Sequence, residues 1–283
     1  MRTLLIGAKG MLGTDIVEDW ATEDLIPADA HNADIRDLNL IRELVSSLRP
    51  DWILLTAAYT DVDGSEKNSE LAFAVNAKGA ENVARAASEF GAKICYISTD
   101  YVFDGTSTRP YESNDALNPL NVYGASKAAG EAAIREFAKE WCIARTSWLF
   151  GAAGASFPEK ILKAAETRPE LTVVADQVGS PTFTRDLSAA IRKLFHSDAR
   201  GILHITNSGV CSWFEFAQEV LKSAGSTVPV RPITASEIAR PAKRPGYSVL
   251  SPTSLNKYGI VMRNWKETIP DYLQDLRKLG KLS

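Results

Sequence analysis

Over roughly the first 150 residues, short apolar segments alternate with segments whose apolar residues recur at helical spacing. The apolar segments read RTLLIG, DLIPADA, DWILLTAA, KICYIST and WCIARTS. The helical segments read MLGTDIVEDW (expected to bury Met11, Leu12, Ile16 and Val17), DLNLIRELVSSLRP, SELAFAVNAKGAENVARAASEFG and YGASKAAGEAAIREFA. Strands that are apolar on both faces and separated by helices are typical of a parallel sheet covered on both sides. Right-handed crossovers then predict an α/β fold with a doubly wound, Rossmann-like sheet.

Three glycines, Gly7, Gly10 and Gly13, lie in IGAKGMLG between the first predicted strand and the first predicted helix. Glycine suits this place because the turn is tight and because a pyrophosphate must approach the backbone closely. Free N–H groups at the start of a helix also face such an anion. The spacing is GxxGxxG rather than GxGxxG, but its position predicts a dinucleotide-binding loop.

The second predicted strand ends at Asp29, 22 residues after Gly7. An acid there is placed to bind the adenosine ribose hydroxyls, which favours NADH. Lys9 and Arg36 are nearby cations that could accept a 2′-phosphate, so NADPH stays open as the cofactor. Asp34 and Ile35 are candidates to flank the adenine.

Two further features bear on this cofactor site. Asp37 is equally placed to cap the following helix, which competes with an adenine role for the segment ADIRD. Ala57, Ala58 and Tyr59 follow the third strand, where small residues leave room for a cofactor at the sheet edge.

The strand and helix pattern loosens after Gly151. LTVVAD, GILHIT and SWFEFAQEVLKSAG predict a strand, a strand and a helix, and the prolines of 229–252 predict an irregular segment that contacts substrate. We therefore expect a dinucleotide-binding domain of residues 1–151 with 178–207. Residues 152–177 with 208–283 would form a smaller, discontinuous substrate-binding portion.

The composition excludes several classes of protein. A net charge of −3 gives no support for a nucleic-acid partner. Cys95, Cys142 and Cys211 are widely spaced, which disfavours a disulfide framework or a zinc site. No apolar stretch approaches the ~20 residues of a membrane span, and the first apolar run is too short for a signal peptide. We expect a cytoplasmic protein with no membrane partner, and we assign no chemistry to its three histidines.

Tyr123 and Lys127 stand four residues apart at the start of a predicted helix, so they share one helical face. A tyrosine hydroxyl normally titrates near ~10, and a neighbouring lysine cation lowers that pKa. The pair suits the reduction of a carbonyl group, in which hydride reaches carbon and a proton must reach oxygen. Ser98 and Thr99 end the fourth strand, where their hydroxyls could hydrogen-bond the same carbonyl or simply form a turn before Asp100.

These motifs together resemble the extended short-chain dehydrogenase/reductase superfamily. AAYTDVDGSE, STDYVFDG, NPLNVYGASKAAGE, RTSWLFG, DQVGSPTFTRDL and RPGYS occur in the order and spacing of the dTDP-4-dehydrorhamnose reductases, over nearly the whole chain. The resemblance implies an NAD(P)H-dependent oxidoreductase of dTDP-rhamnose biosynthesis. Such an enzyme reduces the 4-keto group of dTDP-4-dehydro-β-L-rhamnose to dTDP-L-rhamnose.

The resemblance also implies roles for single residues. Tyr123 would be the proton donor, Lys127 would bind the nicotinamide ribose and lower the tyrosine pKa, and Thr99 would orient the keto oxygen. The remaining implied contacts are Gly10, Met11 and Leu12 at the pyrophosphate, Asn76 in support of the proton relay, Asp100 and Trp148 at the hexose, and Arg244 at the nucleotide diphosphate. Without the resemblance, Trp148 reads as a core residue and Arg240, Lys243 and Arg244 as a solvated cluster.

Some relatives use Mg²⁺ and pair through carboxylates, but only part of that pattern is present. Asp15 falls at one such position, whereas Arg185 stands where another carboxylate is expected. We therefore assign no metal ligands and expect a monomer or homodimer. Two other functions stay open: a reductase or epimerase of another nucleotide-sugar, and a non-catalytic regulatory subunit that binds a dinucleotide.

Overall fold

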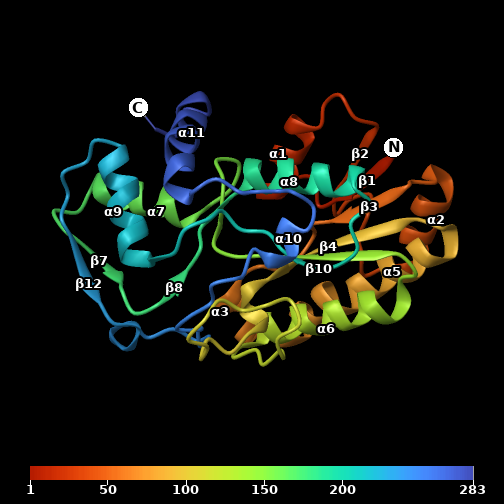
Figure 1. Ribbon diagram of the computed structural model, residues 1–283, viewed down its shortest axis with the longest axis horizontal. Helices are drawn as coiled ribbons and strands as arrows, with labels where there is room; N and C mark the ends of the chain where they lie inside the picture. The colour runs from red at the N-terminus through yellow and green to blue at the C-terminus, as the bar shows by residue number, and fades with distance from the viewer. Residues whose placement is uncertain (283) are drawn as a thin grey trace.

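A six-stranded parallel sheet forms the centre of the computed structural model, which describes residues 1–282 (Figure 1). The strand order is β10-β5-β4-β3-β1-β2, and every neighbouring pair is parallel. The strands are β1 (Thr3–Ile6), β2 (Leu25–Ala28), β3 (Trp52–Leu55), β4 (Lys93–Thr99), β5 (Trp141–Thr146) and β10 (Gly201–His204). The predicted parallel α/β sheet is confirmed.

Helices cover both faces of this sheet (Figure 1). One apolar layer lies under α2 (Leu38–Leu48), α5 (Ala80–Phe90) and α6 (Val122–Phe137). The other lies under α1 (Met11–Asp19) and α8 (Thr184–His196). Val17 departs from the prediction because it is 38% exposed and is not part of this second layer.

The long helix predicted to end at Gly91 is present but locally rewound. It consists of α4 (Ser69–Phe73), the π-helix η1 (Ala74–Gly79) and α5, and it follows α3 (Val62–Lys67). Gly91 caps its end with φ +76°. Because π-helical turns often occur at functional sites, the position of Asn76 inside η1 is notable.

A third apolar cluster holds together the elements that lie beyond the sheet edge, at the left of Figure 1. They include α7 (Phe157–Ala165), β7 (Leu171–Val174), α9 (Trp213–Ser223), β12 (Val230–Ile233) and α11 (Trp265–Lys278). The shorter elements are η2 (Asp100–Val102), β6 (Leu149–Phe150), β8 (Val178–Gly179), β9 (Thr182–Phe183), β11 (Cys211–Ser212), η3 (Ala235–Glu237) and α10 (Thr253–Asn256).

The segment 229–252 is less irregular than predicted, because β12 pairs with β7 in a two-stranded parallel sheet. Pro232 is tolerated there since an edge strand does not need every N–H group. The division into residues 1–151 with 178–207 and 152–177 with 208–283 stays a prediction, and its last residue, Ser283, lies outside the described residues. Within residues 1–282, each helix is too short or too polar to cross a membrane.

Candidate active site

A cleft of about 900 Å³ lies at the carboxyl ends of β1, β3 and β4. The chain places β2 and β3 on opposite sides of β1, and such a reversal of strand order is where doubly wound folds bind ligands. Most of the predicted site residues line this cleft. They are Gly7, Gly10, Met11, Leu12, Asp29, Asp34, Ile35, Ala57, Ala58, Thr99, Asp100, Tyr123, Lys127 and Trp148.

The glycine loop leaves no space for a side chain at Gly7 or at Gly13. Gly7 has φ +105°, and a Cβ atom there would lie 2.5 Å from the Ala57 nitrogen. A Cβ atom on Gly13 would lie 2.2 Å from the Gly7 carbonyl oxygen. Gly10 is the N-cap of α1 and has no side chain to occupy the first helical N–H groups. These features fit a pyrophosphate held by the backbone at a helix N-terminus.

The cations near the second strand are already paired with carboxylates. Lys9 Nζ lies 2.6 Å from Asp29 Oδ2, and Arg36 Nη2 lies 2.7 Å from Asp34 Oδ2. These contacts lower the pKa of both aspartates. A 2′-phosphate would therefore compete with Asp29 and Asp34 for the same cations. Asp37 caps α2 by accepting hydrogen bonds from two backbone N–H groups, as the alternative interpretation of ADIRD expected.

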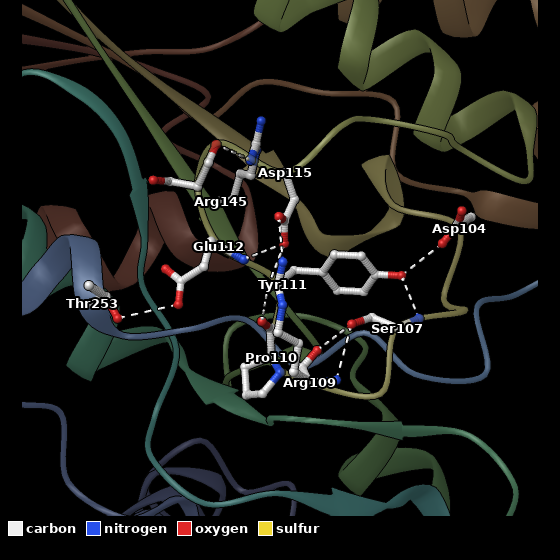
Figure 2. Close-up of polar contacts among 10 residues, drawn as sticks. Asp104, Ser107, Arg109, Pro110, Tyr111, Glu112, Asp115, Arg145 and Thr253 are labelled. Carbon is white, nitrogen blue, oxygen red and sulfur yellow. Dashed lines mark hydrogen bonds and ion pairs between the residues drawn. The ribbon is translucent and has the colours of Figure 1, made fainter.

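The braced loop, residues 103–121, connects η2 after β4 to the start of α6 and is held by hydrogen bonds among its own side chains. These contacts fix the position of Tyr123. Figure 2 shows the Tyr111 hydroxyl donating to Asp104 (2.8 Å) and Arg109 paired with Asp115 (2.8 Å). Four donors converge on Asp104 and hold its pKa far below the usual range. Asn121 then caps α6 by accepting from the Gly124 N–H group.

Tyr123 keeps its proton through neutral pH in this structure. Burial raises the pKa of Tyr123 to about 12, and a hydrogen bond with Thr99 opposes that rise. Lys127, 2% exposed, donates from Nζ to the Ile97 carbonyl oxygen at 2.7 Å and lies 3.9 Å from the centre of the Tyr96 ring. Burial lowers the pKa of Lys127 to about 7, so the lysine loses its charge before the tyrosine titrates.

Asp100 is a buried acid beside these two groups. Its Oδ1 atom accepts a hydrogen bond from the Thr99 hydroxyl at 3.0 Å, while Oδ2 is buried without a partner. Burial raises the pKa of Asp100 to about 7. Because Asp100 lines the cleft and one of its oxygen atoms has no partner, this side chain is a candidate to bind a ligand hydroxyl.

Trp148 is half-buried and stacks on Trp213 from α9, with ring centroids 3.5 Å apart and planes 7° apart. Trp148 has φ +47°, a strained backbone conformation for a large residue, and its ring also lies against Gly179. Trp213 lines the cleft too, although the sequence analysis did not identify it. The capping box of Ser212 and Glu215 marks where α9 begins, but only the tertiary fold brings α9 to the cleft.

Three predicted residues, Tyr59, Asn76 and Arg244, are not part of the cleft lining. Asn76 exchanges hydrogen bonds with the Tyr59 backbone at 2.8 and 3.0 Å and donates to Ser126 Oγ at 2.9 Å. Arg244 makes a two-pronged ion pair with Asp63 on α3, at 2.7 and 3.0 Å. The roles predicted for Tyr59, Asn76 and Arg244 therefore stay predictions.

Arg185, which stands at one of the positions implied for a metal-bridged pairing, is engaged in ion pairs with other residues. Arg185 pairs with Asp275 at 2.9 Å and with Glu18 at 3.4 Å, and its charge also acts on Asp15. Across residues 1–282, no three His, Cys, Asp or Glu side chains gather closely enough to hold a metal ion.

Residues 1–278 match the family described as RmlD substrate binding domain. The chain belongs to this family. A spore coat polysaccharide biosynthesis protein of Bacillus subtilis is 41% identical over 276 residues, which is 97% of each chain. A dTDP-4-dehydrorhamnose reductase of Mycobacterium tuberculosis is 37% identical, covering 95% of this chain and 91% of the relative.

Solved structures agree with this family membership. The dTDP-4-dehydrorhamnose reductase of Bacillus anthracis in complex with NADP superimposes with a TM-score of 0.94 at 40% identity. The match covers 97% of this chain and 99% of that structure. Residues from one end of the RmlD-family chain to the other therefore adopt the fold of a reductase solved with its dinucleotide.

Proposed function

We propose that this protein reduces the 4-keto group of dTDP-4-dehydro-β-L-rhamnose to dTDP-L-rhamnose with NADH or NADPH. Its family and its reductase relatives support the substrate class. The observation that carries the proposal is the meeting of Tyr123, Thr99 and Lys127 with the glycine loop in one cleft. A cytoplasmic location, with no nucleic-acid or membrane partner, belongs to the same proposal, as does a monomeric or homodimeric state.

The cofactor supplies the hydride, and the protein must position the cofactor and deliver a proton. Met11 and Leu12, at the start of α1, would hold the pyrophosphate through their backbone N–H groups. Gly7 and Gly10, whose own N–H groups donate to backbone carbonyls, would let the pyrophosphate approach the loop closely. The other cofactor contacts proposed are Asp29 at the adenosine ribose, Asp34 and Ile35 at the adenine, Ala57, Ala58 and Tyr59 beside the third strand, Asn76 behind the relay, and Lys127 at the nicotinamide ribose.

The keto oxygen becomes an alkoxide as its carbon gains hydride, and it must collect a proton. Tyr123 donates that proton from its hydroxyl, while Thr99 hydrogen-bonds the same oxygen. Asp100 binds a neighbouring sugar hydroxyl, and Trp148 borders the hexose. Arg244 contacts the diphosphate of the nucleotide. The tyrosine is protonated at neutral pH even at its ordinary pKa, and burial, which raises the pKa to about 12, holds the proton more firmly.

The test is to mix the protein with dTDP-4-dehydro-β-L-rhamnose and NADH, or NADPH, and follow the absorbance of the reduced cofactor. Oxidation of the cofactor that depends on the sugar supports the proposal. Oxidation of NADH or NADPH only with a different 4-keto nucleotide-sugar would mean that this other sugar is the substrate. Dinucleotide binding without oxidation by any such sugar would favour a regulatory subunit.

Asp29 gives a prediction about the cofactor. The kcat/KM value with NADH should match or exceed that with NADPH, because Asp29 can bind ribose hydroxyls and already occupies Lys9. Asp29→Ala should lower kcat/KM with NADH about 10-fold, the effect of losing a charged hydrogen bond, and should favour NADPH by freeing Lys9. Asp24→Ala, which removes a surface aspartate paired with Arg2, is the control. A strong NADPH preference in the unmodified protein would show that Lys9 or Arg36 binds the 2′-phosphate in spite of its pairing with an aspartate.

Trp213 gives a prediction about substrate binding. Trp213→Ala removes the ring that supports Trp148, so KM for the nucleotide-sugar should rise about 10-fold while the Kd for NADH stays unchanged. Trp213→Phe should retain most of the affinity because a stacked ring remains. Equal KM values for all three proteins would mean that the stack has no part in binding sugar.

A further inference from the structure

A buried ion pair lies directly behind the proposed catalytic groups. Glu131 on α6 and Arg145 on β5 have side chains that are each 2% exposed, and they share two hydrogen bonds of 2.7 and 2.9 Å. A buried pair of this kind is weak evidence for stability, since apolar residues of similar size often serve equally well. Its location therefore calls for another explanation.

Two contacts connect the pair to the cleft. Ser98, which lines the cleft, donates its hydroxyl to Glu131 Oε1 at 2.6 Å. Lys127 lies one helical turn before Glu131, and both side chains are buried. Lys127 donates to a backbone carbonyl, and no carboxylate of residues 1–282 forms an ion pair with it. The charge of Glu131 acts on it through the protein interior.

Arg145 is in turn held in place by neutral groups. Its Nη1 atom donates to the Ser113 carbonyl oxygen at 3.1 Å, in the braced loop that leads to Tyr123 (Figure 2). The same atom lies 3.3 Å from His204 Nε2. Burial and Arg145 lower the pKa of His204 to about 3, so His204 stays neutral across the working range.

We propose that Glu131, fixed by Arg145, is a positioning residue that keeps Lys127 charged and holds Ser98 at the cleft wall. This inference rests on the proposed function, because the charge of Lys127 is needed to hold the nicotinamide ribose and to assist Tyr123. It gives the pair a task that an apolar replacement could not perform.

The charged and titratable groups around Lys127 decide what a pH profile will report. Tyr96 and Tyr123 titrate far above neutrality, and His204 far below it. Arg145 is bound to Glu131. Asp100 titrates near 7, as Lys127 does, so its contribution has to be removed by experiment.

The experiment measures kcat/KM and the Kd for NADH between pH 5.5 and pH 9.5, in buffers of constant ionic strength, for Glu131→Gln. Lys127 should lose its proton more easily, so the basic limb should move down by about one unit or more. The Kd for NADH at pH 8 should rise about 10-fold. The same shift should occur in an Asp100→Asn background, which removes the competing titration.

Glu131→Gln leaves Arg145 buried and unpaired, so a second variant separates folding from charge. Glu131→Gln/Arg145→Met removes both charges and should restore the melting temperature while keeping the lowered basic limb. Glu159→Gln removes another buried carboxylate that is paired with a lysine four residues away, on α7, and should leave the profile unchanged.

A double variant with the basic limb and the NADH affinity of the unmodified protein would overturn the proposal, because the pair would then serve folding alone. So would an unchanged limb in folded Glu131→Gln. If no nucleotide-sugar is reduced, the proposed function fails, and the pH dependence of the Kd for NADH still decides the role of Glu131.

Discussion

Tyr123→Phe should lower kcat by about 100-fold or more while the Kd for NADH changes little. The substitution removes one oxygen atom, and with it the hydroxyl proposed to donate the proton, from a residue that lines the cleft beside Thr99. Cofactor binding depends on the glycine loop and on Lys127, which the substitution leaves in place. Single-turnover rates and a fluorescence titration with NADH measure the two quantities separately.

The matched control for this variant is Tyr258→Phe, which removes a tyrosine hydroxyl that accepts from the Arg200 N–H group away from the cleft. Its kcat should equal that of the unmodified protein. Full activity in Tyr123→Phe would remove the tyrosine from the mechanism. A loss of NADH affinity as large as the loss of kcat would give it a binding role instead.

Lys127→Met should lower kcat/KM about 100-fold at pH 7 and move the basic limb of its pH profile upward. In the unmodified protein, Lys127 loses its charge as the pH rises through about 7, and activity that needs this charge falls with it. The variant has no such group, so the next group that limits activity is Tyr123, whose pKa is about 12. A profile of kcat/KM from pH 5.5 to pH 10 tests this.

Glu131→Gln and Lys127→Met should therefore move the same limb in opposite directions. Lys163→Met, which removes a surface lysine of α7, is the control and should leave the limb where it is. An unchanged limb in Lys127→Met would contradict a role for the lysine charge. It would assign the limb to Asp100, whose pKa is also near 7.

Lys127 shows what the structure adds to the four-residue spacing of Tyr123 and Lys127. Tyr123 and Lys127 were predicted to share a helical face, and both line the cleft. Spacing could not show that Lys127 is buried and donates to the Ile97 carbonyl oxygen. Spacing predicted that the lysine lowers the pKa of Tyr123, whereas burial raises that pKa to about 12. Proximity along a helix is a local property, whereas desolvation depends on everything that packs around the pair.

The parallel sheet and the glycine loop follow from local physics, so the sequence alone was enough to predict them. Apolar periodicity reports which faces are buried, and the positive φ of the tight strand-to-helix turn favours glycine at Gly7 for a local reason. The same holds for the cap at Asp37 and the helix end at Gly91, since each involves groups only a few residues apart.

Contacts between distant segments were decided by the tertiary structure alone. Trp213 stacks on Trp148 from 65 residues away along the chain, and Arg244 is held by Asp63 from 181 residues away. Glu131 meets Arg145 only because α6 packs against β5. Sequence spacing fixes neighbours along one element, but burial and charge pairing depend on which elements the whole fold brings together.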